Sequence, residues 1–316
     1  LVEYGVDGEI VREVFHRIRR TPFGRERDDD RVAAVWFDYV SFNQLARHVP
    51  AQDMLILNRQ GRLATIGNAE ELVLVTGYRP GHIYANDLVA LRDGATLTPK
   101  DVRRAELLAV YLAEVHQTQH EDPTLWRRRL RDLVGHGEGV MGLTDSYPSD
   151  LAYIDTEILR AIEAAANDWR WRLKPRSHRL AQVHGDFHPF NIIFHEQLEF
   201  YVLDRSRGMW GEPADDVSCL AVNYLFFSLQ RYGRLDGPFR DLYDRFWYFY
   251  FLTRPDEELV EVIQPWFAWR ILVLASPLWY PDIDDEVRRK LINFARNVLD
   301  CKAYDYQNPN PYFEEP

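Results

Sequence analysis

Lysine is scarce in this chain of 316 residues, and the first 99 residues have none at all. Of the 38 basic residues only four are lysines, and the first of them is Lys100. Arginine is therefore the basic residue available in residues 1–99. Arginine is not a neutral replacement for lysine, because its planar guanidinium presents a rigid fork of donors instead of a compact point charge.

Cysteines and long apolar runs are also scarce. Cys219 and Cys301 are the only cysteines, too few for a disulfide framework, and they favour a reducing cytoplasm. No apolar run approaches the roughly 18 residues that a membrane-spanning helix needs. The opening LVEYGVDGEIVREV also lacks the basic and apolar regions of a signal peptide. The sequence therefore predicts a cytoplasmic protein that does not act on a membrane.

An excess of positive charge is missing as well. The net charge of -11 argues against general nucleic-acid binding, where a basic face supplies most of the affinity. It suits a cationic small-molecule substrate instead. With 46% hydrophobic and 28% charged residues the composition is that of a soluble globular protein. The chain is long enough for one large domain or for two smaller lobes that each have a core.

The N-terminal residues have the pattern of a small β-sheet with one helix. Strands are expected at 1–6 and 9–18, on either side of the turn dipeptide Asp7-Gly8. Further strands are expected at 53–58, 62–66 and 71–78. Between them, residues 29–48 have helical spacing, with an apolar face that comprises Val32, Val35, Trp36, Tyr39 and Phe42.

After Arg79-Pro80-Gly81 the pattern becomes mainly helical. Amphipathic helices are expected at 99–117, where Pro99 suits the first turn, and at 151–172. A hairpin pattern follows, then aromatic-rich helices from about 214 to 300 and an irregular tail after Tyr304. We therefore expect an α+β protein with a small N-terminal lobe, 1–78, and a larger helical lobe, 79–316.

Residues 183–204, VHGDFHPFNIIFHEQLEFYVLD, hold the most informative polar residues. A loop carries Asp186 and, five residues later, Asn191; a short hairpin then returns Asp204 to the same end of the sheet. One amide oxygen and one carboxylate suit Mg²⁺, which keeps its other sites for water and phosphate oxygens. A nearby carboxylate that does not bind the metal orients a hydroxyl and accepts its proton. This division of roles is the one that phosphoryl transfer requires.

The same segment resembles the catalytic loop of the aminoglycoside phosphotransferase and choline kinase family, whose members have a protein-kinase-like fold. The family pattern is H-G-D-x-x-x-x-N, then a hydrophobic residue and Asp, then G-D-P-x-x-D. This chain has His184-Gly185-Asp186, Asn191, Leu203-Asp204, and Gly211-Glu212-Pro213 with Asp216. The resemblance spans most of residues 70–300, although the closely matching motifs occupy only about thirty of them.

The resemblance implies a kinase that moves the γ-phosphoryl of ATP or GTP to a hydroxyl of a small molecule. An aminoglycoside-like or amino-alcohol acceptor is the expected one. By this resemblance Asp186 is the catalytic base, and Asn191 and Asp204 bind Mg²⁺. His184 would support the loop, and Asp216 would cap or anchor backbone in the helical lobe.

The chain departs from the family at the nucleotide-binding lysine. Relatives place this lysine on a strand of the small lobe, where it pairs with phosphate oxygens and with an acid from the helix. Here the matching strand carries only arginines, so that Arg17, Arg19 or Arg20 would take its place, with Asp30 or Asp38 as the partner acid. In addition, no glycine-rich phosphate loop precedes residue 5.

A second departure follows Asp204, where Arg205 and Arg207 replace the usual aromatic and acidic residues. Two readings stay open: these guanidinium groups hold phosphate or reduce binding of a second metal, or they are solvated surface arginines. Two rival functions also stay open. One is a pseudokinase that binds nucleotide without turnover, and the other is an enzyme on the same scaffold that transfers AMP.

Overall fold

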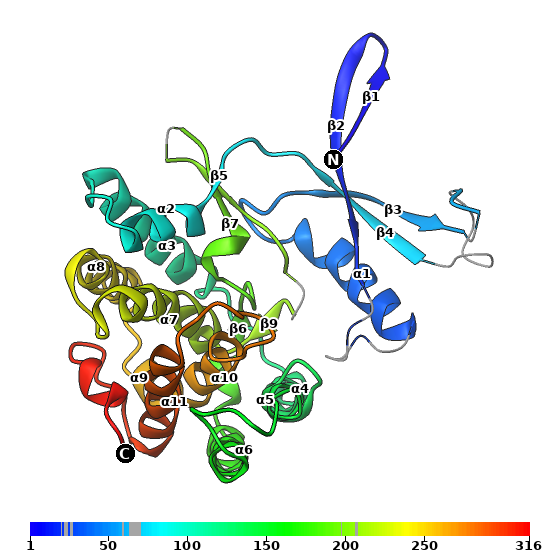
Figure 1. Cartoon of the computed structure of the whole chain (residues 1–316). Helices are drawn as coiled ribbons and strands as arrows, with labels where there is room; N and C mark the ends of the chain where they lie inside the picture. The colour runs from blue at the N-terminus through cyan, green and yellow to red at the C-terminus, as the bar shows by residue number, and fades with distance from the viewer. Residues whose placement is uncertain are drawn as a thin grey trace. The chain divides into compact units, whose positions relative to one another are not determined.

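The computed structural model describes the chain except residues 20, 22–24, 26–27, 59, 63–70, 197 and 206–207, and except the side chains of residues 28, 29, 71 and 72. The strands are β1 Val2–Val6, β2 Glu9–Arg17, β3 Ala51–Leu57, β4 Glu71–Gly77, β5 His82–Ile83, β6 Ala181–Gln182, β7 Ile192–Phe194, β8 Phe200–Val202 and β9 Trp210–Gly211. The α-helices, labelled in Figure 1 where there is room, are α1 Asp28–Phe42, α2 Tyr84–Arg92, α3 Pro99–Val115, α4 Pro123–Gly135, α5 Val140–Thr144, α6 Thr156–Leu173, α7 Pro213–Tyr232, α8 Gly237–Thr253, α9 Leu259–Val262, α10 Gln264–Leu274 and α11 Asp285–Asp300. The described residues also form the short 3₁₀ helices η2 Ser177–Arg179, η3 Pro189–Asn191 and η4 Asn310–Phe313.

The chain divides into two compact units that are not continuous in sequence. The first comprises Leu1–Tyr84 together with His184–Asp186 and Phe190–Met209. The second comprises Ala85–Val183, Phe187–Pro189 and Trp210–Pro316. The first unit therefore contains the small N-terminal sheet and also the hairpin that follows the catalytic-loop motif.

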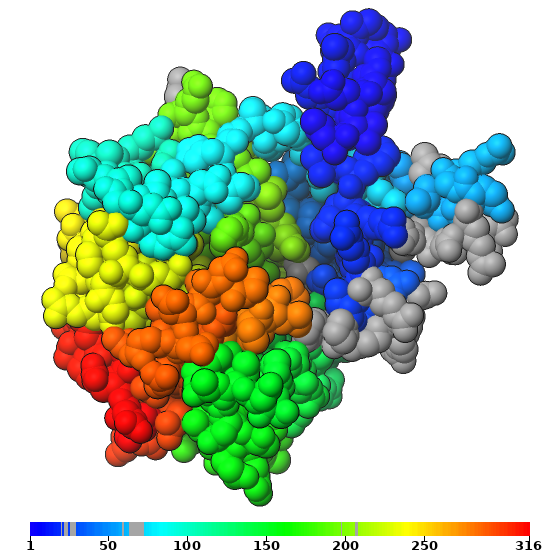
Figure 2. All heavy atoms as spheres, in the orientation of Figure 1, coloured from blue at the N-terminus to red at the C-terminus, as the bar shows by residue number. Residues whose placement is uncertain are grey.

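The first unit begins with the expected hairpin. β1 and β2 pair antiparallel with Val6 opposite Glu9, so that Asp7 and Gly8 alone form the turn. Both residues have positive φ, 52° and 88°, as a type I′ turn requires, and this geometry matches the right-handed twist of the strands. The hairpin tip, dark blue in Figure 2, projects beyond the other strands of the sheet, whose order is β1-β2-β4-β3.

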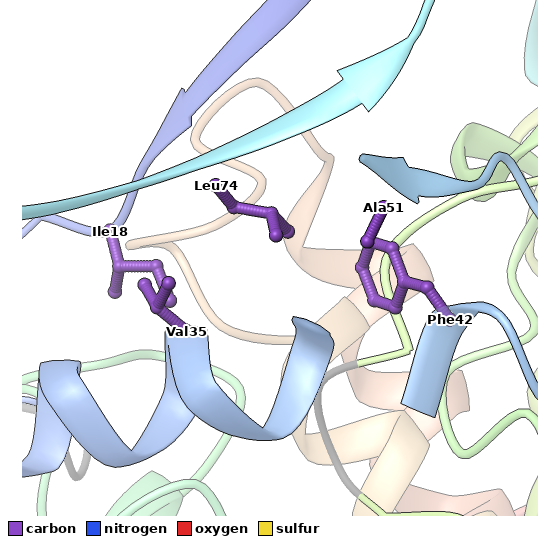
Figure 3. Packing of buried hydrophobic residues seen from close by; sticks show 5 residues of the cluster. All are labelled: Ile18, Val35, Phe42, Ala51 and Leu74. Atoms are coloured by element: carbon purple, nitrogen blue, oxygen red, sulfur yellow. The ribbon is translucent and has the colours of Figure 1, made fainter. Parts of the chain in front are cut away.

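Helix α1 packs on this sheet through a small apolar core (Figure 3). The core consists of Ile18, Val35, Phe42, Ala51 and Leu74, and each of these is less than a tenth exposed. The helix ends at Phe42, earlier than expected. After it, the Asn43 side chain donates to the carbonyl of Ala51 and accepts from its N–H, which fixes the connection from α1 to β3.

The expected apolar face of α1 is only partly correct. Val35 and Phe42 are buried, but Val32 and Trp36 are 47% and 55% exposed. The buried face is rotated toward Asp38, which is only 1% exposed. Because polar side chains occupy part of the buried face, hydrophobic spacing alone predicted only part of that face.

A second sheet in the first unit is built around the expected hairpin at the catalytic motif. β7 pairs antiparallel with β8, with Ile192 opposite Val202, and β5 adds to the other edge of β7. The connection from α1 to β3 joins β8 through a parallel bridge between His48 and Val202. The N–H of Val49 donates to the Val202 carbonyl at 3.2 Å.

The second unit is mainly helical, and several helix starts follow from their capping residues. Helix α3 begins at Pro99 after a capping box between Thr98 and Asp101. Helix α6 begins at Thr156 rather than near 151, because the Asp155 side chain caps the N–H of Ile158. The early part of the expected 151–172 helix was therefore wrong.

Aromatic side chains form much of the core of the second unit. On α7 and α8, Tyr224, Phe226, Trp247 and Tyr250 are buried, while Tyr248 is exposed. The C-terminal segment, red in Figure 2, is irregular apart from η4 and lies against α11, with Phe313 buried there. None of the helices in the described part of the chain combines the length and the apolar character of a membrane span.

Candidate active site

The loop that carries Asp186 contains a hydrogen bond to its own histidine. The Asp186 N–H donates to Nδ1 of His184 at 3.2 Å, and Gly185 between them has φ 88°, a conformation that glycine adopts without steric cost. His184 has no exposed surface, whereas Asp186 is 8% exposed. The structure thus places His184 inside the loop; its supporting role stays a prediction.

A second histidine, which the sequence did not single out, packs against His184. The rings of His48 and His184 stack with centroids 6.1 Å apart, and His48 also lies 4.0 Å from the ring of Phe42. Burial, and secondarily the proximity of His184, lower the pKa of His48 to about 3. His48 is therefore neutral at physiological pH, and its Nδ1 lies 2.7 Å from the Val49 carbonyl.

Asn191 connects the Asp186 loop to the hairpin. Its Nδ2 donates to the Asp186 carbonyl at 3.1 Å, and its own carbonyl accepts from the Leu203 N–H at 2.8 Å. Because Nδ2 is engaged with the backbone, the amide oxygen Oδ1 is the atom left for a ligand. These bonds bring Asn191 next to the residue that precedes Asp204, as the hairpin pattern predicted.

Asp204 lies at the end of this hairpin, half-buried, with φ 54°. Among the described residues, no basic side chain lies within ion-pair distance of its carboxylate. A left-handed conformation in a residue other than glycine costs about 1–2 kcal/mol, so the surrounding contacts must hold it. A hard oxygen set of one amide and one carboxylate fits Mg²⁺, which binds proteins through few ligands and completes its shell with water and phosphate oxygens.

No larger metal cluster competes with this pair in the part of the chain that the structure describes. There, no group of three or more histidine, cysteine, aspartate or glutamate side chains is arranged to hold a metal ion.

The arginine after Asp204 is not a surface residue. Arg205 has no exposed surface, and its guanidinium donates to the carbonyls of Ser41 at 2.9 Å and Met209 at 3.2 Å. The reading of Arg205 as a solvated arginine is therefore wrong. Arg207 lies outside the described residues.

Two of the three arginines expected to replace the small-lobe lysine lie on an exposed strand end. Arg17 is the last residue of β2, opposite Val73, and Arg19 follows two residues later. Both are exposed, and Ile18 between them is buried, so they share one face. Arg20 lies outside the described residues. Of the expected partner acids, Asp38 is buried and Asp30 half-buried.

In the second unit, Asp216 lies in a fully buried polar group. Its carboxylate is 3.1 Å from Nε2 of His116, and the other nitrogen of that ring is 2.8 Å from the Tyr250 hydroxyl. Burial lowers the pKa of His116, an effect that Asp216 opposes. The Asp216 carboxylate, in the first turn of α7, thus contacts the histidine that caps the end of α3.

A family profile identifies the protein family to which the catalytic-loop motif belongs. The profile of the phosphotransferase enzyme family (APH) matches residues 26–256, more than two thirds of the chain. The chain belongs to the phosphotransferase enzyme family. Its fold and family make it a kinase-type phosphotransferase, and the family resemblance drawn from the catalytic loop is confirmed.

Solved structures share the fold of this phosphotransferase. It is similar to the amicoumacin kinase hAmiN in complex with AMP-PNP, Ca²⁺ and Ami, with 16% identity over 96% of this chain and 87% of that one and a TM-score of 0.55. This likeness shows a protein-kinase-like fold. No curated protein sequence matches the chain.

Two more distant structures give TM-scores below 0.5. The aminoglycoside phosphotransferase APH(3'')-Id from Streptomyces rimosus, in complex with ADP and streptomycin, is 14% identical over 77% of this chain and 85% of that one, with a TM-score of 0.49. The choline kinase LicA from Streptococcus pneumoniae is 14% identical over 84% and 79%, with a TM-score of 0.47.

Sequence reasoning missed the residues that hold this phosphotransferase's loop from outside the motif. His48 is a single histidine in a connection, and nothing in its neighbourhood in sequence marks it. Ser41 acts only through its backbone carbonyl, which no side-chain pattern can show. Arg205 was noticed because it departs from the family, but its burial depends on tertiary contacts.

Proposed function

We propose that the protein transfers the γ-phosphoryl of ATP or GTP to a hydroxyl of a small molecule, with an amino alcohol or an aminoglycoside-like compound as the acceptor class. The observation that carries this proposal is the hydrogen-bonded link between Asp186, Asn191 and the residue before Asp204. This link joins the loop that carries Asp186 to the hairpin that ends at Asp204, and Asp186, Asn191 and Asp204 all belong to the first unit.

In this proposal each residue has one task. Asp186, on its loop, orients the acceptor hydroxyl and takes its proton. Oδ1 of Asn191 and the carboxylate of Asp204 would hold Mg²⁺, which supplies positive charge to the phosphates when bound. An arginine of the β2 end, Arg17 or Arg19 among the described residues, would contact phosphate in place of lysine. Catalysis then depends on positioning and electrostatics.

The acceptor class is supported by charge. The net charge of -11 attracts amine-bearing molecules and disfavours nucleic acid as a partner. The solved kinase with the same fold holds AMP-PNP, Ca²⁺ and Ami, and by analogy we propose a nucleotide, a divalent cation and a small acceptor for this chain. The low content of cysteine agrees with action in a reducing cytoplasm.

The test is a turnover screen with ATP and GTP across amino alcohols, amino sugars, aminoglycosides and hydroxylated metabolites, followed by mass measurement of the product. A product heavier than its acceptor by one phosphate supports the proposal. An increase by one AMP identifies the AMP transferase instead, and nucleotide binding without any product identifies a pseudokinase.

Two variants tell this activity apart from that of a contaminant. Asp186→Asn should lose turnover, whereas Asp168→Asn, which changes an exposed carboxylate of α6, should retain it. Equal turnover in both variants would contradict the assignment of Asp186.

A further inference from the structure

A buried arginine lies directly beside the proposed metal ligand. Arg205 follows Asp204 in the chain and has no solvent-exposed surface. Burying a guanidinium is costly unless its donors are bonded. Here Nη1 donates to the Ser41 carbonyl at 2.9 Å and Nη2 to the Met209 carbonyl at 3.2 Å. Because the guanidinium has no exposed surface, it contacts the neighbouring backbone and is not available to a ligand that arrives from solvent.

The first partner, Ser41, lies in the last turn of α1. The terminal carbonyls of a helix have no partner within the helix and carry partial negative charge. Helix α1 has no basic residue of its own in that turn. Arg205 supplies this cation from a segment that is 164 residues away in sequence. The guanidinium therefore binds the end of α1 to the chain just after Asp204.

The second partner, Met209, lies four residues after Arg205. This bond joins the guanidinium to the backbone at Met209. On the other side of Asp204, the Leu203 N–H is bonded to the Asn191 carbonyl at 2.8 Å. Asp204 is thus held from both sides while its own backbone has the left-handed φ of 54°.

We propose that Arg205 is a positioning residue for Asp204, and that the affinity of the site for its divalent cation depends on the bond between Arg205 and the end of α1. This inference rests on the proposed function, because it requires Asp204 to be a metal ligand. Residues that orient metal ligands from outside the coordination shell typically change metal affinity by about 10- to 100-fold when replaced.

The experiment is a titration with Mn²⁺ in the presence of AMP-PNP, with free Mn²⁺ followed by electron paramagnetic resonance. Arg205→Met keeps the length of the side chain and removes its donors, and it should raise the Mn²⁺ dissociation constant about 10-fold or more. Arg205→Lys keeps the positive charge but lacks the paired donors of the guanidinium, and it should raise the Mn²⁺ dissociation constant by less than Arg205→Met does. AMP-PNP affinity without metal should stay the same in both variants.

The matched control is Arg12→Met, which removes an exposed arginine of the first unit that pairs with Glu3; its titration should equal that of the wild type. A merely structural role for Arg205 would lower the fraction of active protein, and hence the amplitude, without moving the midpoint. A folded Arg205→Met protein with the wild-type midpoint overturns the inference. If that variant does not fold, an unchanged midpoint in Arg205→Lys overturns it instead.

The proposed metal site and the positioning role fail in different ways. If Asp204→Ala removes Mn²⁺ binding while both Arg205 variants keep the wild-type midpoint, the positioning role alone is wrong. If the wild-type protein with AMP-PNP binds no Mn²⁺, the metal site of the proposed function is wrong and the inference falls with it.

Discussion

Carboxylates in the second unit differ in their surroundings from Asp204 in the first. Glu212, Asp215 and Asp216 have no exposed surface. Glu212 accepts from Arg179 at 2.6 Å, Asp215 pairs with Arg270 and Arg129, and Asp216 contacts His116. Asp204 is half-buried, and no basic side chain among the described residues lies within ion-pair distance of its carboxylate.

The difference separates carboxylates that stabilise the fold from one that is available to a ligand. Glu212 and Asp215 already pair with buried guanidinium groups, and removing either partner of such a pair leaves a costly unpaired charge. The Asp204 carboxylate has no such ion-pair partner among the described residues and is therefore available to an incoming cation. The predictions below test this separation, in order of decreasing effect.

The largest effect is expected at Asp204. Asp204→Ala should abolish metal-supported nucleotide binding, because it removes the only charged metal ligand we propose. Isothermal titration calorimetry with Mg²⁺ and AMP-PNP measures this directly. The melting temperature should change little, since the carboxylate has no ion-pair partner among the described residues; normal metal dependence in the variant would remove Asp204 from the site.

Asp186→Asn should affect the rate and leave binding nearly intact. This change keeps the shape of the side chain but removes the proton acceptor, an effect on the order of 10²–10⁴-fold in kcat, or roughly 3–5 kcal/mol. Single-turnover kinetics beside a nucleotide titration separate the two quantities. A proportional loss of nucleotide affinity would make Asp186 a metal ligand.

Asp215→Ala should act on stability instead. The change leaves the guanidinium groups of Arg270 and Arg129 without their shared carboxylate, and breaking a buried pair in this way costs about 3–5 kcal/mol. Urea denaturation at neutral pH gives the free energy of unfolding. Asp168→Ala, on the exposed surface of α6, is the control and should stay within about 0.5 kcal/mol of the wild type. An equally stable Asp215→Ala protein would remove the contrast between the two kinds of carboxylate.

The smallest effect concerns pH. His48 has a pKa of about 3 in the folded state, below the roughly 6.5 of an unfolded histidine. As the pH falls below about 6.5, the unfolded state therefore binds a proton that the folded state does not. Stability should fall by up to about 1.4 kcal/mol per pH unit from this residue. Denaturation curves of wild type and His48→Asn at pH 7, 6 and 5 measure the slope, which should be smaller in the variant; identical slopes would show that His48 is not buried as a neutral ring.

The sequence was sufficient for the parts of the fold that local rules determine. Asp7-Gly8 specified its turn through backbone preference, and the short apolar runs at 192–194 and 200–202 specified the hairpin. It was also sufficient for the family, because the offsets from Asp186 to Asp216 are fixed by the loop and hairpin between them.

What the sequence did not show depends on contacts across long separations. The buried face of α1 could not be predicted from Val32 and Trp36, because both are exposed and the buried face includes Asp38. One partner of Arg205 is the backbone carbonyl of Ser41, far away in sequence, and hydrophobic periodicity carries no information about such a bond. The orientation of His48 toward His184 likewise follows only from the pairing of two segments.

The discontinuity of the first unit has a consequence for how the chain is made. Its sheet and α1 end by Tyr84, but the hairpin that contacts His48 and the guanidinium that binds Ser41 are synthesised more than a hundred residues later. At ordinary rates of translation this delay is on the order of ten seconds. During that time the end of α1 lacks its cation and His48 lacks its ring partner. The N-terminal segment must therefore wait for the second unit to emerge in part before the first can be completed, and a fragment that ends near residue 84 would lack both contacts.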